Sequence, residues 1–210
     1  MPTDLPDLLI DDPARPAPLT FAFAHGAGAP MDTPFMAFFA EGLAARGWRV
    51  ARFEFPYMAA RRQGSSRPPP DRQPVLLETW RRVTEALGPG PLVIGGKSMG
   101  GRMASLLADE MQVAGLACLG YPFHPAGKPE RLRTEHLAAL ETPCLVCQGT
   151  RDALGSAEEV AGYRLSPAIR LHWAEDGDHD LKPRKASGRT AEQNWTAALD
   201  ALDGFFRSLT

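Results

Sequence analysis

The segment with the clearest chemical character is Leu92–Gly101, which reads LVIGGKSMGG. It places Ser98 between Gly96 and Gly100, directly after an apolar run that is typical of a strand. When a serine sits on a tight strand-to-helix turn, its hydroxyl projects, and the residues two before and two after it must be small. The pattern therefore predicts that Ser98 is a nucleophile. The N–H of Met99, at the start of the helix that follows, is the expected donor to a developing oxyanion.

Two further side chains are placed to activate this serine. A serine hydroxyl needs a base, because it is almost entirely protonated at neutral pH. Asp152, in the sequence GTRD, and His179, in DGDHD, each follow a strand-like run. The order serine, aspartate, histidine is the one found with a GxSxG turn of this kind. We predict that His179 is the general base and that Asp152 orients it. Asp176 and Asp178 are alternatives in principle, but a residue in the same loop reaches the Nδ1 of His179 less easily.

The loop after the first expected parallel strand, His25–Ala29, lies where a second oxyanion donor is needed. Ala27 is the predicted donor. His25 precedes the serine in the chain, so it is interpreted as a loop-organising residue close to the substrate and not as the base. His124, at the end of an expected strand Tyr121–Pro125, is a candidate to line the substrate pocket.

Basic residues follow two strand ends. Arg61 and Arg62 begin a loop, Arg61–Gln73, that is rich in Arg, Pro, Ser and Gly, and a second cluster, Lys182–Lys185, follows His179. If both face the site they favour an anionic substrate, with Arg61 and Arg62 as binding residues. The alternative is a solvated charged surface, and the sequence leaves both open.

Other chemistries fit less well. Gly96-Lys97-Ser98 is similar to the end of a phosphate-binding loop, but Pro91 stands where that motif requires glycine. The aspartates around His179 have no further His or Cys nearby, so no metal is expected. Cys144 and Cys147 form a CxxC pair inside an apolar run, which favours buried structural thiols. We expect no cofactor.

The pattern of short apolar runs between segments of helical period predicts a mainly parallel sheet with helices on both faces. A further edge strand is expected near Leu8–Ile10. Six parallel strands are expected at Leu19–Ala24, Trp48–Phe53, Leu92–Ile94, Gly115–Leu119, Cys144–Gln148 and Ile169–Trp173. Helices are expected to begin at Thr33-Pro34, at Pro74 and at a Thr190/Gln193 capping box. A further helix is expected over the run Arg102–Glu110.

Composition sets the class of protein. The chain has 210 residues, 44% of them hydrophobic and 23% charged, which fits one globular domain over residues 1–210. With 23 basic and 25 acidic residues the net charge is −2, which argues against a nucleic-acid partner. No apolar run reaches membrane-spanning length and Met1–Asp12 has no signal-like pattern, so a cytoplasmic protein without a membrane partner is expected. The expected partner is a small-molecule acyl substrate, and the oligomeric state is left open.

Taken together, five segments resemble a family of small bacterial α/β-hydrolases related to the dienelactone-hydrolase group. The segments are His25–Pro30, Gly95–Arg102, Tyr121–Pro125, Gly149–Asp152 and Asp176–Leu181. The resemblance implies an α/β-hydrolase fold of about six to seven strands without a cap domain, a Ser98, Asp152, His179 triad, and hydrolysis of an ester, thioester or related acyl bond. The dienelactone group typically has cysteine where this chain has Ser98. Some eukaryotic relatives are subunits of chromatin-regulating complexes, so a non-catalytic interaction protein is the alternative.

Overall fold

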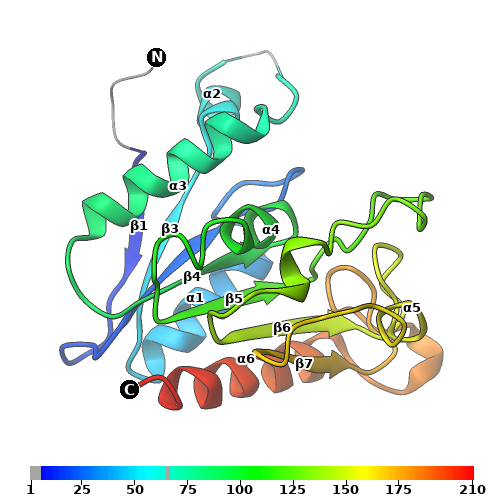
Figure 1. The fold of residues 1–210 in the computed structure, drawn as a ribbon. Coiled ribbons are helices and arrows are strands. Elements are labelled where there is room, and N and C mark those ends of the chain that lie inside the picture. The colour runs from blue at the N-terminus through cyan, green and yellow to red at the C-terminus, as the bar shows by residue number, and fades with distance from the viewer. Residues whose placement is uncertain (1–5, 65–66) are drawn as a thin grey trace.

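The computed structural model describes residues 6–64 and 67–210. Seven strands form one sheet in the order β1-β3-β2-β4-β5-β6-β7 (Figure 1). The strands are β1 (Leu8–Asp11), β2 (Thr20–Ala24), β3 (Arg49–Phe53), β4 (Leu92–Lys97), β5 (Gly115–Leu119), β6 (Cys144–Gly149) and β7 (Ile169–Ala174). From β2 to β7 every pairing is parallel, and β1 pairs antiparallel with β3 at one edge. The predicted strands and the edge strand are thus confirmed.

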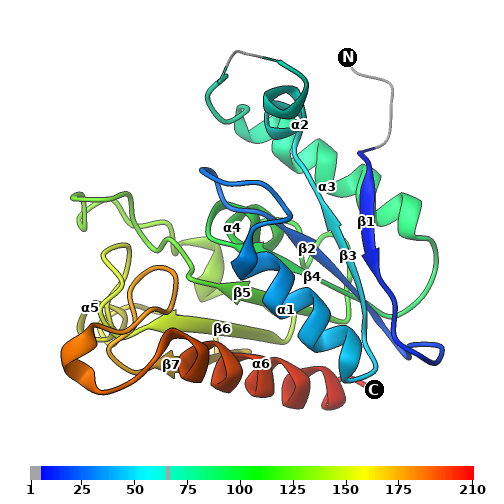
Figure 2. The same ribbon diagram turned by 180° about the vertical axis from the view of Figure 1, so that it is seen from behind.

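Helices cover both faces of the sheet (Figures 1 and 2). The helices are α1 (Pro34–Ala45), α2 (Pro56–Gln63), α3 (Gln73–Leu87), α4 (Met99–Ser105), α5 (Ala157–Val160) and α6 (Ala191–Arg207), with short 3₁₀ turns at His136–Ala138 and Lys185–Ser187. Successive strand residues point to opposite faces. On β2, Phe21 and Phe23 therefore join the core under α1 and α6, whereas Ala22 and Ala24 join the core under α3 and α4. The sheet is buried on both sides, as a parallel sheet requires.

Two helix starts form as their sequences predict. The Thr33 hydroxyl accepts a hydrogen bond from the Met36 N–H at 3.3 Å, and Pro34 occupies the first turn of α1. At the start of α6, Thr190 and Gln193 form the predicted capping box in both directions. The two helices are therefore fixed at the ends from which they pack against one face of the sheet.

The parallel strands place their C-terminal ends at one edge, where β4 leads to Ser98, β6 to Asp152 and β7 to His179. In the part of the chain that the structure describes, no insertion between strands forms a cap domain over this edge. The fold is the α/β-hydrolase arrangement that the sequence predicts, and a site at this edge has only loops around it.

Three local predictions are wrong. Arg61 and Arg62 lie in the last turn of α2 and not in a loop, although residues 65–66 of the expected loop, like residues 1–5 of the N-terminal segment, lie outside the described residues. No strand forms at Tyr121–Pro125, because the Tyr121 N–H bonds to the Gln148 side chain instead of to a neighbouring strand. The helix after Ser98 ends at Ser105 and not at residue 110, where the chain continues in turns.

Candidate active site

Ser98 occupies the turn between β4 and α4 in a strained backbone conformation, with φ 51° and ψ −115°. Residues other than glycine rarely adopt backbone angles in this region, and the strain costs on the order of 1–3 kcal/mol. The flanking glycines make the turn possible. A Cβ at Gly96 would lie 2.4 Å from the Ala24 carbonyl oxygen, and one at Gly100 would lie 2.6 Å from that of His25. β4 extends through Lys97, so the glycines before Ser98 belong to a strand and not to a phosphate-binding loop.

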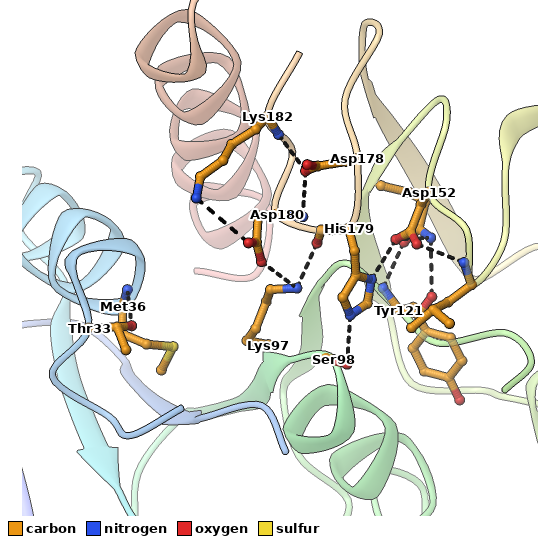
Figure 3. A network of polar contacts seen from close by, with 12 residues as sticks. Thr33, Met36, Lys97, Ser98, Tyr121, Asp152, Asp178, His179, Asp180 and Lys182 are labelled. Carbon is orange, nitrogen blue, oxygen red and sulfur yellow. Dashed lines mark hydrogen bonds and ion pairs between the residues drawn. The ribbon is translucent and has the colours of Figure 1, made fainter. Parts of the chain in front are cut away.

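The three predicted residues form one chain of hydrogen bonds (Figure 3). The Nε2 of His179 lies 2.8 Å from the Ser98 Oγ, and its Nδ1 lies 2.8 Å from the Asp152 Oδ2. Because an ionised carboxylate only accepts hydrogen bonds, Nδ1 carries the ring proton and Nε2 is left to accept the serine proton. The Asp152 side chain is fully buried, whereas the imidazole is 29% exposed and open to a substrate.

Gln148 holds the aspartate from the same strand. Its Nε2 donates to Asp152 Oδ2 at 2.9 Å, while the Leu154 N–H donates to Oδ1 at 2.8 Å. The Gln148 Oε1 accepts from the Tyr121 N–H at 2.7 Å. Sequence reasoning missed this residue. A polar side chain inside the apolar strand CLVCQG, four residues before a candidate acid, is the signal that could have identified it.

Lys97 is the second residue that sequence reasoning missed. Its side chain is only 11% exposed, and its Nζ donates to the backbone carbonyl of His179 at 2.6 Å (Figure 3). Nζ also lies 3.3 Å from Asp180 Oδ1 and 5.6 Å from the centre of the Phe35 ring. Burial lowers the pKa of Lys97, and the Asp180 carboxylate opposes that shift. The lysine beside Ser98 therefore anchors the loop that carries His179.

The other aspartates of the histidine loop have different partners. Asp176 forms ion pairs with Arg184 and Arg151, and the hydrogen bond from Arg184 lowers its pKa to about 2. Asp178 accepts the backbone N–H groups of Asp180 and Lys182. These two carboxylates shape the loop, and Asp152 is the one that contacts the imidazole.

The loop that begins at His25 lies next to Ser98. A Cβ at Gly26 would lie 3.5 Å from the Ser98 Cβ, and the Tyr57 hydroxyl donates to the Ala27 carbonyl at 2.9 Å. The His25 Nε2 accepts the Phe55 N–H at 3.1 Å, and its Nδ1 donates to the Gly26 carbonyl. Burial lowers the pKa of His25. Because its side chain is fully buried, His25 organises the loop and offers no exposed atom to a substrate.

The remaining predicted binding residues are engaged elsewhere. His124 is buried, and its Nε2 lies 3.4 Å from Glu159 Oε1. Arg62 pairs with Glu54 and Asp32, and the hydrogen bonds that it donates to these two carboxylates raise its pKa. Arg61 donates to the Pro68 carbonyl and covers the Tyr57 ring. The structure thus gives Arg61 and Arg62 partners within the protein, and the roles of His124, Arg61 and Arg62 toward a substrate stay predictions.

The described residues offer neither a metal cluster nor a membrane-spanning helix. Within residues 6–64 and 67–210, no group of three or more His, Cys, Asp or Glu side chains is arranged to hold a metal ion. No helix in the same ranges is both long and apolar enough to cross a membrane. Cys118, Cys144 and Cys147 are free and buried, and burial raises the pKa of Cys147 and of Cys144.

Comparison with known proteins identifies the family of the chain. A family model described as an alpha/beta hydrolase domain matches residues 17–207. The chain belongs to that family. No curated protein matches the chain in sequence.

Solved structures share the hydrolase fold over nearly the whole chain. An α/β serine hydrolase homologue from Coxiella burnetii is 19% identical, covers 91% of this chain and 89% of its own, and has a TM-score of 0.69. XC6422 from Xanthomonas campestris, an α/β serine hydrolase without a lid, is 21% identical with coverages of 91% and 85% and a TM-score of 0.69. Est1E from Butyrivibrio proteoclasticus, solved with ferulic acid bound, is 15% identical with coverages of 96% and 95% and a TM-score of 0.73. At these identities the likeness shows the fold alone.

Proposed function

We propose that this α/β-hydrolase is a serine hydrolase that cleaves a carboxylic ester or related acyl bond of a small substrate through an acyl-enzyme. The observation that carries the proposal is the continuous contact from Ser98 through His179 to Asp152, at 2.8 Å for each link. In the proposed reaction Ser98 is the nucleophile, His179 is the general base and then the general acid, and Asp152 orients the imidazole and stabilises its charged form.

In the acylation step, His179 Nε2 accepts the hydroxyl proton as Ser98 Oγ attacks the substrate carbonyl carbon. The carbonyl oxygen becomes an oxyanion. The proposed donors to it are the N–H of Met99, which as the first residue of α4 has no partner within the helix, and the N–H of Ala27 in the loop beside Ser98. When the intermediate collapses, the carbon–oxygen bond to the alcohol breaks, and His179 gives its proton to the departing oxygen.

In the deacylation step, water takes the place of the alcohol. His179 removes a proton from the water as it attacks the acyl-serine, and returns that proton to Ser98 Oγ when the acid leaves. No cofactor or metal takes part in the proposed cycle. We also propose a small-molecule acyl substrate, with no nucleic-acid or membrane partner, and a cytoplasmic location. Three free, buried cysteines support the location, because disulfides are common in secreted proteins.

Covalent labelling tests the proposal directly. The purified protein is treated with a fluorophosphonate, and the adduct is counted and located by intact-mass and peptide mass spectrometry. We expect one adduct per chain, at Ser98, and none in Ser98→Ala. Ser208→Ala, which changes an exposed serine at the end of α6, should label like the unmodified protein.

Turnover of p-nitrophenyl acetate gives a second measurement. Ser98→Ala and His179→Ala should each lower kcat by a factor on the order of 10⁶, and the double variant should lose little more, because the residues act as one unit. A folded protein that neither reacts at Ser98 nor hydrolyses any ester would contradict the enzyme proposal and favour a non-catalytic interaction protein.

A further inference from the structure

A cavity of about 780 Å³ opens beside α4, between that helix and the chain segment 125–133. Figures 1 and 2 show this segment projecting beyond the C-terminal ends of β5 and β6, at the edge of the sheet where the proposed triad lies. Among the described residues that line it, Glu130 is the one acidic side chain. Four of the lining residues are cations: Arg102, Lys128, Arg131 and Arg133.

These four cations have no ionic partner in the described part of the chain. Within residues 6–64 and 67–210, no carboxylate, including that of Glu130, lies within 4.0 Å of a charged nitrogen of any of them. By contrast, Arg62 on α2 and Arg184 after His179 each pair with a carboxylate. The Nε of Arg102 is buried and makes no hydrogen bond to a described residue. A buried donor without an acceptor is costly, and it points to an acceptor that the protein itself does not provide.

The charges in the cavity also act on one another. Burial lowers the pKa of Arg133, and the neighbouring charges of Arg102 and Arg131 lower it further. Like charges held together without a counter-ion repel, whereas a bound anion would be attracted to all of them. Guanidinium groups bind carboxylates through two parallel hydrogen bonds, which makes a cluster of arginines suited to an oxyanion of this shape.

The cavity is close to the proposed nucleophile. The Arg102 N–H donates to the Ser98 carbonyl at 3.0 Å, so the two residues are one helical turn apart. Four residues of α-helix rise roughly 6 Å, and residues four apart share a helix face. The opposite wall is tied to the site as well, because the Arg133 N–H donates to the Phe123 carbonyl at 2.7 Å, two residues after the Tyr121 that Gln148 holds.

We propose that this cavity binds a carboxylate on the far end of the acyl substrate, so that the enzyme prefers ester substrates that carry a second, anionic group. The inference rests on the proposed hydrolase function and names its substrate class. In this inference the residues that select an anion are Arg102, Arg131 and Arg133. Arg61 and Arg62, which the sequence suggested for that role, are engaged within the protein. Because Ser98 and Arg102 are one helical turn apart, we choose a short dicarboxylic half-ester and an aromatic ester with a para carboxylate as probes.

The first test uses pairs of esters that differ only in charge. One pair is monomethyl and dimethyl adipate, and the other is 4-acetoxybenzoate and its methyl ester. We expect kcat/KM at low salt to favour the anionic member of at least one pair by about tenfold or more, and the preference to fall as salt is added. The double variant Arg131→Gln/Arg133→Gln should lose most of that ratio. Arg170→Gln, an exposed arginine on β7 outside the cavity, should keep it.

The outcomes separate this inference from the function on which it rests. Suppose that the neutral esters are hydrolysed and that this activity depends on Ser98. If neither anionic ester is then preferred, or if the double variant keeps the same ratio of kcat/KM values, the anion site alone is overturned. A second measurement needs no turnover. Binding of free adipate, followed by calorimetry, should weaken at least tenfold in the double variant and stay unchanged in Arg170→Gln. Equal binding to all three proteins, or no binding to any, would overturn the site even if no ester is hydrolysed.

Discussion

Lys97 and Ser98 are neighbours in the chain, but they act on different parts of the same histidine. Ser98 contacts the imidazole, whereas Lys97 holds the backbone carbonyl of the residue that carries it. The contact that Lys97 makes is not visible in the sequence, because it joins residues 82 positions apart. The motif places the proposed nucleophile, and the lysine inside the motif holds the loop of the proposed base.

We expect Lys97→Met to lower kcat by about 10- to 100-fold with little change in KM, because the histidine loop loses its anchor and small displacements of a catalytic group are costly. Lys97→Arg, which keeps a donor, should recover part of the loss. Lys182→Met is the matched control, since Lys182 reaches Asp180 Oδ2 at 3.7 Å and has no bond to the His179 carbonyl. Steady-state kinetics on one ester measures all four proteins. Equal kcat for Lys97→Met and Lys182→Met would mean that the anchor does not position the base.

At the scale of elements, the β4–α4 turn depends on close approach of two backbones. Gly100 has the carbonyl oxygens of His25 and Ala24 at 2.6 and 2.7 Å from where a Cβ would be, whereas Gly204 on α6 has open space around that point. Replacement of glycine by alanine should therefore have opposite effects on the free energy of unfolding at these two positions.

Gly100→Ala should lower the free energy of unfolding by about 1–3 kcal/mol through overpacking against rigid backbone. Gly204→Ala should raise it by about 0.5–1 kcal/mol, because alanine favours the helix and meets no obstacle. Urea denaturation measures both free energies of unfolding, with one common slope of free energy against urea concentration for all variants. If Gly100→Ala proved as stable as the unmodified protein, the tight turn around Ser98 would be in doubt.

The elements that the sequence predicted well are those with strong local signals. Strands β2 to β7 and the caps of α1 and α6 follow from apolar runs and from Thr33 and Thr190. Helix α2 was missed because its composition is polar and its stability is tertiary, with the Tyr57 N–H bonded to Asp71 and Arg62 paired with Glu54. The contact of His179 with Ser98 and Asp152 could be predicted from motif order. The anchoring roles of Lys97 and Gln148 could not, because they depend on which loops meet at the sheet edge.

On the scale of the whole molecule, three histidines outside the proposed triad are withdrawn from water, His25 fully and His136 and His172 in part. Burial lowers the pKa of His25, His136 and His172, and for His136 the value falls to about 4, with Arg102 adding to the shift and Asp109 opposing it. Each of these histidines binds a proton more readily in the unfolded chain than in the folded protein. Folding is therefore most favourable above the unfolded pKa of about 6.5 and weakens as pH falls below it.

We expect the free energy of unfolding to be lower at about pH 5.5 than at about pH 7.5, a range in which most carboxylates stay ionised. The slope should reach up to about 1.4 kcal/mol per pH unit for each histidine that is protonated only when unfolded. Urea denaturation at the two pH values measures the difference, and it should shrink in His136→Gln. Equal stability at both pH values would show that these side chains are not shielded as described.

The adjacency of Lys97 and Ser98 also affects how parts of this protein could be exchanged with those of another hydrolase. A graft of the loop 176–182 alone would carry the histidine but not the ammonium group that donates a hydrogen bond to its carbonyl. The loop and the strand end must therefore be taken from the same protein, or the protein that receives the loop must already have a lysine before its serine. In engineering, the β4–α4 turn and the histidine loop are one transferable part, although 77 residues of chain lie between Ser98 and residue 176.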